Sequence, residues 1–126
     1  EQYDTVVTSN MFGDIFTDLG AALVGGLGIA SSANLHPGKT SLFESIHGSA
    51  PQFAGQNRAN PLATIMAVSM MLDYLGEKTA ATRIEDAVVR LLRSHKLPNL
   101  GMDSGFGTDQ VGQLVLDELA GAGAGR

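Results

Sequence analysis

The sequence contains no cysteine among its 126 residues. Without a thiol the chain can form no disulfide, no zinc–thiolate site and no cysteine nucleophile, and this composition fits a cytoplasmic protein. Charged residues are few, at 17%, and acids outnumber bases to give a net charge of −5. Because surplus carboxylates find no counter-charge on nucleic acid or on an anionic membrane, we expect neither as a partner.

Long apolar runs are also missing. Residues 19–38 carry no Asp, Glu, Lys or Arg, but glycine, serine, asparagine, histidine and proline interrupt the stretch, which indicates soluble core and not a membrane span. The glycines at 26 and 28 are not followed by the third glycine of a GxGxxG motif, so no Rossmann fingerprint is present. The chain opens without methionine or a signal-peptide pattern, and we interpret it as part of a longer protein.

The remaining composition, 44% hydrophobic, is typical of a globular protein. The β-branched run at 4–8 predicts a buried strand, and shorter strands are expected at 27–29 and 42–44. Apolar spacing predicts helices, and Asn60-Pro61 is a helix start in which Asn caps free amides and Pro occupies the first turn. A Gly/Ala-rich tail over 120–126 is expected to fray. The predicted helices cover residues 14–24, 61–75, 79–94 and 108–119.

Two carboxylates, Asp14 and Asp18, lie four residues apart and therefore share a face of the first predicted helix. Such a pair can hold Mg²⁺ or Mn²⁺ through one oxygen each and leave positions for water and a chelating substrate. The alternative, commoner for an isolated pair, is two solvated acids favoured by the positive end of the helix dipole. Because like charges at this spacing destabilise a helix by roughly a few tenths of a kcal/mol, their placement after a buried strand favours a bound cation.

The second candidate is the loop that follows the strand at 42–44. Small residues at 48–50 would let backbone amides approach a ligand closely, and His47 offers a polar aromatic edge. This combination suits an adenine nucleotide. The alternative is a turn-rich connection with a surface histidine, because loops are polar by default.

Four segments, in this order and spacing, resemble the β-hydroxyacid oxidative decarboxylases, the isocitrate/isopropylmalate/tartrate dehydrogenase family. The resemblance spans residues 4–112 and rests on SNMFGDIFTD, GGLGIASSAN, LFESIHGSAPQFAG and the ANP helix that ends in MMLDYLGE. It implies a two-domain α/β fold of the isopropylmalate-dehydrogenase type, non-Rossmann, of which this chain is the C-terminal portion. Residues 1–24 would end the smaller, dimer-forming domain, and residues 25–126 would form the C-terminal half of the larger nucleotide-binding domain.

The resemblance also implies a homodimeric enzyme that uses NAD and Mg²⁺ or Mn²⁺ for the oxidative decarboxylation of a malate-type 2-hydroxy acid. Tartrate, D-malate and 3-isopropylmalate are the expected substrates, ahead of isocitrate. Asp14 and Asp18 match the family's in-chain metal ligands, with a third carboxylate from a neighbouring subunit; the substrate-binding arginines, the tyrosine and the lysine base would precede residue 1. The positions implied to line the nucleotide site are Ile29, Glu44, His47, Gly48, Ser49, Ala50, Gln52, Phe53, Asn60 and Asn99.

The sequence departs from the family pattern at Gln52, where NAD-dependent members usually have an Asp that holds the ribose hydroxyls. Residues 97–102 lack the Tyr and Arg with which NADP-dependent isocitrate dehydrogenases of the bacterial type bind the 2′-phosphate, so NAD is expected. Arg58 is the one nearby cation that would favour NADP instead. The departure at Gln52 leaves open a non-catalytic regulatory or assembly subunit of a heteromeric dehydrogenase. An unrelated Mg²⁺-dependent hydrolase is disfavoured, because no nucleophile or phosphate loop accompanies the acid pair.

Overall fold

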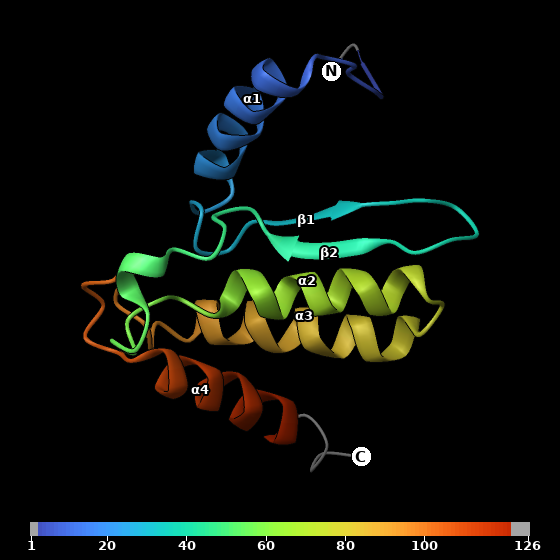
Figure 1. Ribbon diagram of the computed structural model, residues 1–126. Coiled ribbons are helices and arrows are strands. Elements are labelled where there is room, and N and C mark those ends of the chain that lie inside the picture. The colour runs from blue at the N-terminus through green and yellow to red at the C-terminus, as the bar shows by residue number, and fades with distance from the viewer. Residues whose placement is uncertain (1–2, 122–126) are drawn as a thin grey trace.

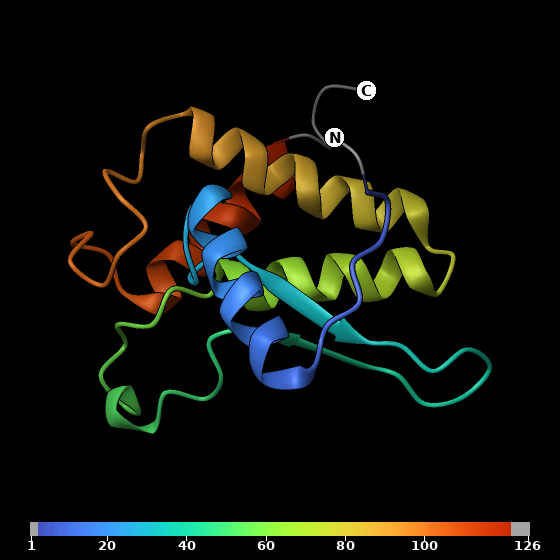
Figure 2. The ribbon, with the colours of Figure 1, turned by 90° about the horizontal axis from the view of Figure 1, so that it is seen from above.

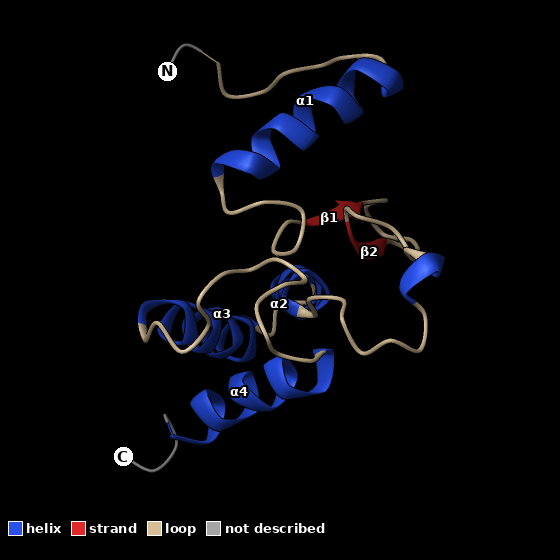
Figure 3. Ribbon diagram, turned by 90° about the vertical axis from the view of Figure 1, so that its left-hand side faces the viewer, coloured by secondary structure: helices blue, strands red, loops and turns tan. Residues whose placement is uncertain are grey.

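The computed structural model describes residues 3–121, a mixed helix and strand fold built in layers. A helix lies above a two-stranded hairpin, the hairpin packs on the first of two antiparallel helices, and the last helix packs against the second of them (Figures 1 and 3). This agrees with the expected α/β class. The elements are α1 (Asn10–Leu23), β1 (Ser31–Asn34), β2 (Leu42–Ser45), the 3-10 turn η1 (Pro51–Phe53), α2 (Leu62–Tyr74), α3 (Lys78–Arg93) and α4 (Thr108–Gly121).

The hairpin presents different residues to the layers on its two sides. β1 and β2 pair antiparallel, with Ser32 opposite Glu44. Phe43 is half-buried, and its ring centroid lies 5.7 Å from that of Tyr74 on α2. Because successive side chains of a strand point to opposite faces, Glu44 and its partner Ser32 lie on the other face, toward α1.

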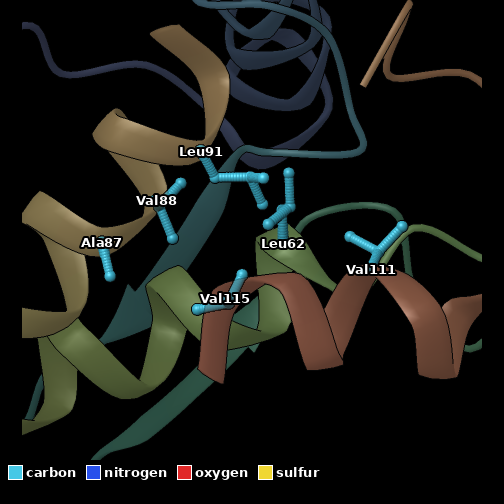
Figure 4. Close-up of a cluster of buried hydrophobic side chains, with 6 residues drawn as sticks. All are labelled: Leu62, Ala87, Val88, Leu91, Val111 and Val115. Carbon is cyan, nitrogen blue, oxygen red and sulfur yellow. The ribbon is translucent and has the colours of Figure 1, made fainter. Parts of the chain in front are cut away.

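The hydrophobic core joins α2, α3 and α4 (Figure 4). α3 contributes Ala87, Val88 and Leu91 to this core, and Leu91 has no exposed surface. Leu62, at the start of α2, is also fully buried. Every member of this core therefore lies after residue 60: Leu62, Ala87, Val88, Leu91, Val111 and Val115.

The start of α2 confirms the Asn60-Pro61 signal. The Asn60 side-chain oxygen accepts a hydrogen bond of 3.0 Å from the Leu62 amide, so it satisfies a donor of the first helical turn. Its amide nitrogen donates to the Leu100 carbonyl, also at 3.0 Å. One side chain thus ties the beginning of α2 to the loop before α4.

α1 begins at Asn10, four residues before the predicted start, with Ser9 at its N-cap. Asp14 is therefore the fifth helical residue and not the first, as predicted. Since the dipole effect fades beyond the first turn, the helix dipole favours the two acids little, but both side chains are exposed to solvent, and the choice between solvated acids and a metal site stays open.

One side of α1 is apolar and exposed, and α1 makes no extensive contact with another helix or strand of the described residues. Figure 2 shows the helix lying across the top of the hairpin. The exposed apolar residues of α1 are Met11, Phe12, Ile15, Phe16, Leu19 and Leu23.

The domain boundary expected near residue 24 stays a prediction. Within residues 3–121, no helix is both long and apolar enough to cross a membrane.

Two predicted strands are wrong. Residues 4–8 are exposed and unpaired in the described chain, and a strand forms only where a neighbour supplies hydrogen-bond partners. Residues 27–29 form turns, because Gly25 and Gly26 take positive φ values of 117° and 95° and redirect the chain, so the strand starts later, at Ser31. Of the predicted tail, 120–121 belong to α4, and 122–126 lie outside the described residues.

Glu118 of α4 binds two cations from α3 and the segment that follows it. Its carboxylate lies 2.8 Å from Lys96 Nζ and 3.6 Å from Arg90 Nε, and its side chain is 18% exposed. The hydrogen bond from Lys96 lowers the pKa of Glu118 below its ordinary value of 4.5, partly opposed by desolvation. The ion pairs thus fasten the last helix to α3.

We expect Glu118→Gln to lower the free energy of unfolding at neutral pH and to matter less as the medium becomes acidic. A carboxyl whose folded pKa is depressed stabilises the fold above its unfolded pKa, and this contribution disappears as the pH falls toward the folded pKa. Urea unfolding from about pH 3 to pH 7 measures the difference. Glu85→Gln, at an exposed α3 residue with no ion pair in the described structure, is the matched control; equal pH dependence of the two variants would contradict the prediction.

Candidate functional site

A polar cleft of about 540 Å³ opens between α1 and the outer face of the hairpin. Helical spacing places Asn10, Asp14 and Asp18 on one side of α1. The alternation of β1 and β2 brings Ser32 and Glu44 to the opposite wall. The complete lining is Asn10, Asp14, Thr17, Asp18, Ser32, Asn34, Glu44, Ser45, Ile46 and Gly48.

The donors in this cleft fit a hard divalent cation. Both aspartates are exposed and line the same cavity, among amide and hydroxyl oxygens, which are the ligand types that Mg²⁺ and Mn²⁺ prefer. Among residues 3–121, no three His, Asp or Glu side chains gather in a way that could enclose an ion. Asp14 and Asp18 can therefore supply only part of a coordination shell, and the remaining ligands must be water, substrate or another segment.

A second cavity, of about 350 Å³, lies where four loops meet at one end of the helical layers. Its lining is mostly apolar, with His47, Gln52 and Asn60 as the polar side chains. Its walls come from segments that are far apart in the sequence. They are Leu27, Gly28, His47, Ala50, Gln52, Phe53, Ala59, Asn60, Leu100, Gly101 and Met102.

The residues predicted to bind a nucleotide divide into three groups. His47, Ala50, Gln52, Phe53 and Asn60 come together in the apolar cavity. Glu44 and Gly48 line the polar cleft. The other three lie outside both cavities: Ser49 is exposed, Ile29 packs against the core and Asn99 lines a small internal cavity beside Arg58.

Leu27, Leu100 and Met102 line the apolar cavity but were not predicted as site residues. Leu100 and Met102 follow α3 in a loop without a recognised motif, and only the tertiary fold brings them to Asn60. Gly28 also lines this cavity. A Cβ there would lie at ordinary van der Waals distance, 3.4 Å, from the Leu100 carbonyl oxygen, so the glycine gives no local signal either.

The segment between the two cavities has an uncommon backbone. Gly48 and Ala50 take positive φ values of 68° and 42°, and a left-handed alanine is a strained feature of the kind concentrated at binding sites. The consecutive residues His47 and Gly48 line different cavities. A ligand that passes over this turn would therefore reach from the apolar cavity to the carboxylate pair.

The tautomer of His47 follows from its contact. Its Nδ1 lies 2.7 Å from the Gly48 carbonyl oxygen, which can only accept a hydrogen bond. Nδ1 therefore carries the proton in this arrangement. In the neutral ring Nε2 is then an acceptor, able to bind an amino group.

The family model described as isocitrate/isopropylmalate dehydrogenase matches residues 1–115. The isocitrate/homoisocitrate dehydrogenase of Thermus thermophilus is 53% identical over 120 residues, 94% of this chain and 35% of that protein. The 3-isopropylmalate dehydrogenase of Thermobifida fusca is 47% identical over 124 residues, 97% of this chain and 34% of that protein. The chain thus spans about a third of the length of these relatives.

The fold agrees with the sequence comparison. The crystal structure of isocitrate dehydrogenase from Methylococcus capsulatus superimposes with a TM-score of 0.81 at 45% sequence identity, covering 90% of this chain and 34% of that one. The match of the family model extends over most of the chain and includes both candidate cavities. The chain belongs to the isocitrate/isopropylmalate dehydrogenase family.

Proposed function

We propose that the full-length protein carrying this chain is an NAD-dependent, divalent-metal-dependent dehydrogenase that oxidatively decarboxylates a malate-type 2-hydroxy acid. One observation carries the proposal. A cleft with two carboxylates on one helix face adjoins an apolar cavity of suitable chemistry for a nucleotide, and the two meet at His47 and Gly48. Binding of two different ligands side by side requires such an arrangement.

In this proposal Asp14 and Asp18 hold Mg²⁺ or Mn²⁺, each through one carboxylate oxygen. When bound, the cation would polarise the substrate oxygens and NAD would accept the hydride. Asn10 and Ser32, on the two walls of the same cleft, offer further oxygens to bound water or substrate. Glu44 adds a negative charge near the turn, which favours a cationic group at this edge of the cleft.

The apolar cavity would hold the adenosine part of the nucleotide. Phe53 and Met102 provide apolar surface for a planar base, as in most small-molecule sites. His47 Nε2 would accept from the exocyclic amino group, because its Nδ1 is already used within the loop. Gln52, exposed at the rim of the cavity, would offer its amide to the ribose hydroxyls in place of a carboxylate.

The substrate is inferred from the sequence. We interpret residues 32–37 and 70–76 as resembling the tartrate and D-malate branch, whereas similar curated proteins bear the names 3-isopropylmalate, isocitrate/homoisocitrate and homoisocitrate dehydrogenase. We therefore propose a malate-type acid and test it with a panel. Purified full-length protein is incubated with Mn²⁺, NAD and each of tartrate, D-malate, 3-isopropylmalate, isocitrate and homoisocitrate, and reduced cofactor and CO₂ are measured. Nucleotide binding without turnover on any acid would favour the non-catalytic subunit.

We also propose that the full-length protein is a homodimer, as the resemblance implies. The apolar side of α1 is exposed in a chain that spans about a third of its relatives' length, and we expect it to be covered in the complete assembly. Light scattering on the full-length protein distinguishes a dimer from a monomer.

We expect kcat/KM to be higher with NAD than with NADP by about tenfold or more, because no cation in the cavity wall is available for the 2′-phosphate. Met102 lines the cavity, whereas Arg58 lines only the small neighbouring cavity, which shares Ala59, Asn60 and Gly101 with it. Initial rates with each cofactor at saturating acid measure the preference. Arg58→Ala is expected to leave it unchanged, whereas faster turnover with NADP that this variant abolishes would show that Arg58 binds the phosphate.

A further inference from the structure

The loop between η1 and α2 has almost no apolar anchorage. Residues 54–58 are all exposed, yet this loop leads directly into Ala59 and Asn60, which line the apolar cavity. A loop without buried side chains keeps its shape only through hydrogen bonds or ligand contacts. The contacts that hold residues 54–58 in place therefore also affect the position of these two cavity residues.

Asn57 holds the loop through a reciprocal pair of hydrogen bonds to α4. Its Nδ2 donates to Asp109 Oδ1 at 2.6 Å, and its Oδ1 accepts from the Asp109 amide at 3.1 Å. The Asn57 carbonyl also accepts from the Thr108 amide at 3.0 Å. Asn57 thus caps the start of α4 from a distant segment by satisfying two of its free amides.

The backbone around this contact is specialised for it. Asn57 has a φ of 53°, the left-handed region that asparagine tolerates better than most residues. A Cβ at Gly107 would lie 2.5 Å from Asn57 Nδ2, so a larger residue there would displace the Asn57 side chain from its contact with Asp109. The Thr108 hydroxyl adds a bond of 2.6 Å to the carbonyl of Ala59, a cavity residue. We name this set, Asn57 with Gly107, Thr108 and Asp109, the clasp.

The charge state of the clasp agrees with its geometry. The hydrogen bond from Asn57 is the largest cause that lowers the pKa of Asp109 below its ordinary value, followed by the bond from the Gln110 amide. The carboxylate form is therefore the one that accepts from Asn57, as in other charge-assisted bonds.

We propose that Asn57 is a positioning residue for the nucleotide: through the clasp it fixes the loop over residues 54–60 against α4 and so sets the shape of the apolar cavity. This inference rests on the proposed function of that cavity. Asn57 itself lines neither cavity, so its effect on the ligand is transmitted through Ala59 and Asn60.

The experiment uses three variants of the full-length protein. Asn57→Gly keeps the left-handed backbone accessible while it removes the side-chain bonds. Asn57→Asp places a carboxylate against Asp109. The double variant Asn57→Asp/Asp109→Asn exchanges the two side chains and restores a donor opposite an acceptor. Gln113→Ala, which removes a 2.8 Å side-chain bond to Asp117 from the same helix, is the control.

Two readouts separate this inference from the proposed function. Hydrogen exchange without nucleotide reports whether the Thr108 and Asp109 amides and residues 54–60 loosen. Titration with NAD, together with the KM for NAD and kcat, reports the consequence for binding. We expect faster exchange and a KM for NAD raised roughly three- to tenfold in Asn57→Gly, with kcat and the KM for the acid nearly unchanged. Asn57→Asp is expected to be more severe, and the exchanged pair is expected to recover most of both effects.

If the unsubstituted protein binds neither NAD nor NADP, the proposed function is contradicted, whatever the exchange data show. With binding intact, an unchanged KM for NAD in Asn57→Gly despite faster loop exchange would overturn the inference. An equal fall of kcat in all three variants, without rescue in the exchanged pair, would also overturn it, because it would indicate general destabilisation.

Discussion

Asp14→Asn and Asp18→Asn in the full-length protein are each expected to lower kcat/KM at least about a hundredfold, which corresponds to roughly 2.7 kcal/mol of transition-state stabilisation. Each change preserves the side-chain shape and would remove one anionic ligand from the proposed metal site, whose cation prefers carboxylates. Folding should change little, because removal of like-charge repulsion between neighbours on one helix face is itself mildly favourable.

The measurement follows turnover as a function of Mg²⁺ and Mn²⁺ concentration, with NAD binding and the melting temperature recorded in parallel. Asp86→Asn, the same substitution at an exposed position of α3, is the control. Partial recovery at high Mn²⁺ would support a weakened metal site. Full activity of both variants at low metal concentration would show that the pair does not hold the cation.

Leu91→Ala is expected to lower the free energy of unfolding by about 2–5 kcal/mol. Leu91 has no exposed surface and packs in the cluster that joins α2, α3 and α4, so its truncation leaves a cavity that three helices can fill only by moving. Chemical denaturation measures the loss. Leu116→Ala, at an α4 leucine with 57% of its surface exposed, should cost much less, and similar losses for the two variants would be inconsistent with the described core.

The helices could be predicted from the sequence because their signals are local. Leu91 and its neighbours recur at helical spacing, and Asn60-Pro61 marks the start of α2 with residues whose capping chemistry needs no tertiary context. The segment 4–8 shows the limit of such reasoning. Its β-branched composition is compatible with a strand, but pairing depends on a neighbour that local composition does not specify.

The candidate site could be predicted only in part for the same reason. Asp14 and Asp18 share a face by helical geometry, and His47 belongs to a recognisable loop. Met102 and Leu100 enter the apolar cavity through the tertiary contact with Asn60, and Asn57 meets Asp109 across a separation of 52 residues. These contacts leave no spacing pattern in the sequence. A family resemblance supplies motifs, but the loop packing around them becomes visible only in the fold.

The alternation of side chains along the hairpin decides which residues face the cleft. Glu44 and Ser32 face α1 because they hold the same alternate positions, while Phe43, one residue away, faces α2. A single-residue deletion inside β2 would exchange the two sets, placing a carboxylate against the helices and a phenyl ring among the polar groups of the cleft. Length changes confined to the connection at 35–41 leave this alternation untouched. Variation among relatives should accordingly be free in the connection and restricted to substitutions within the paired residues.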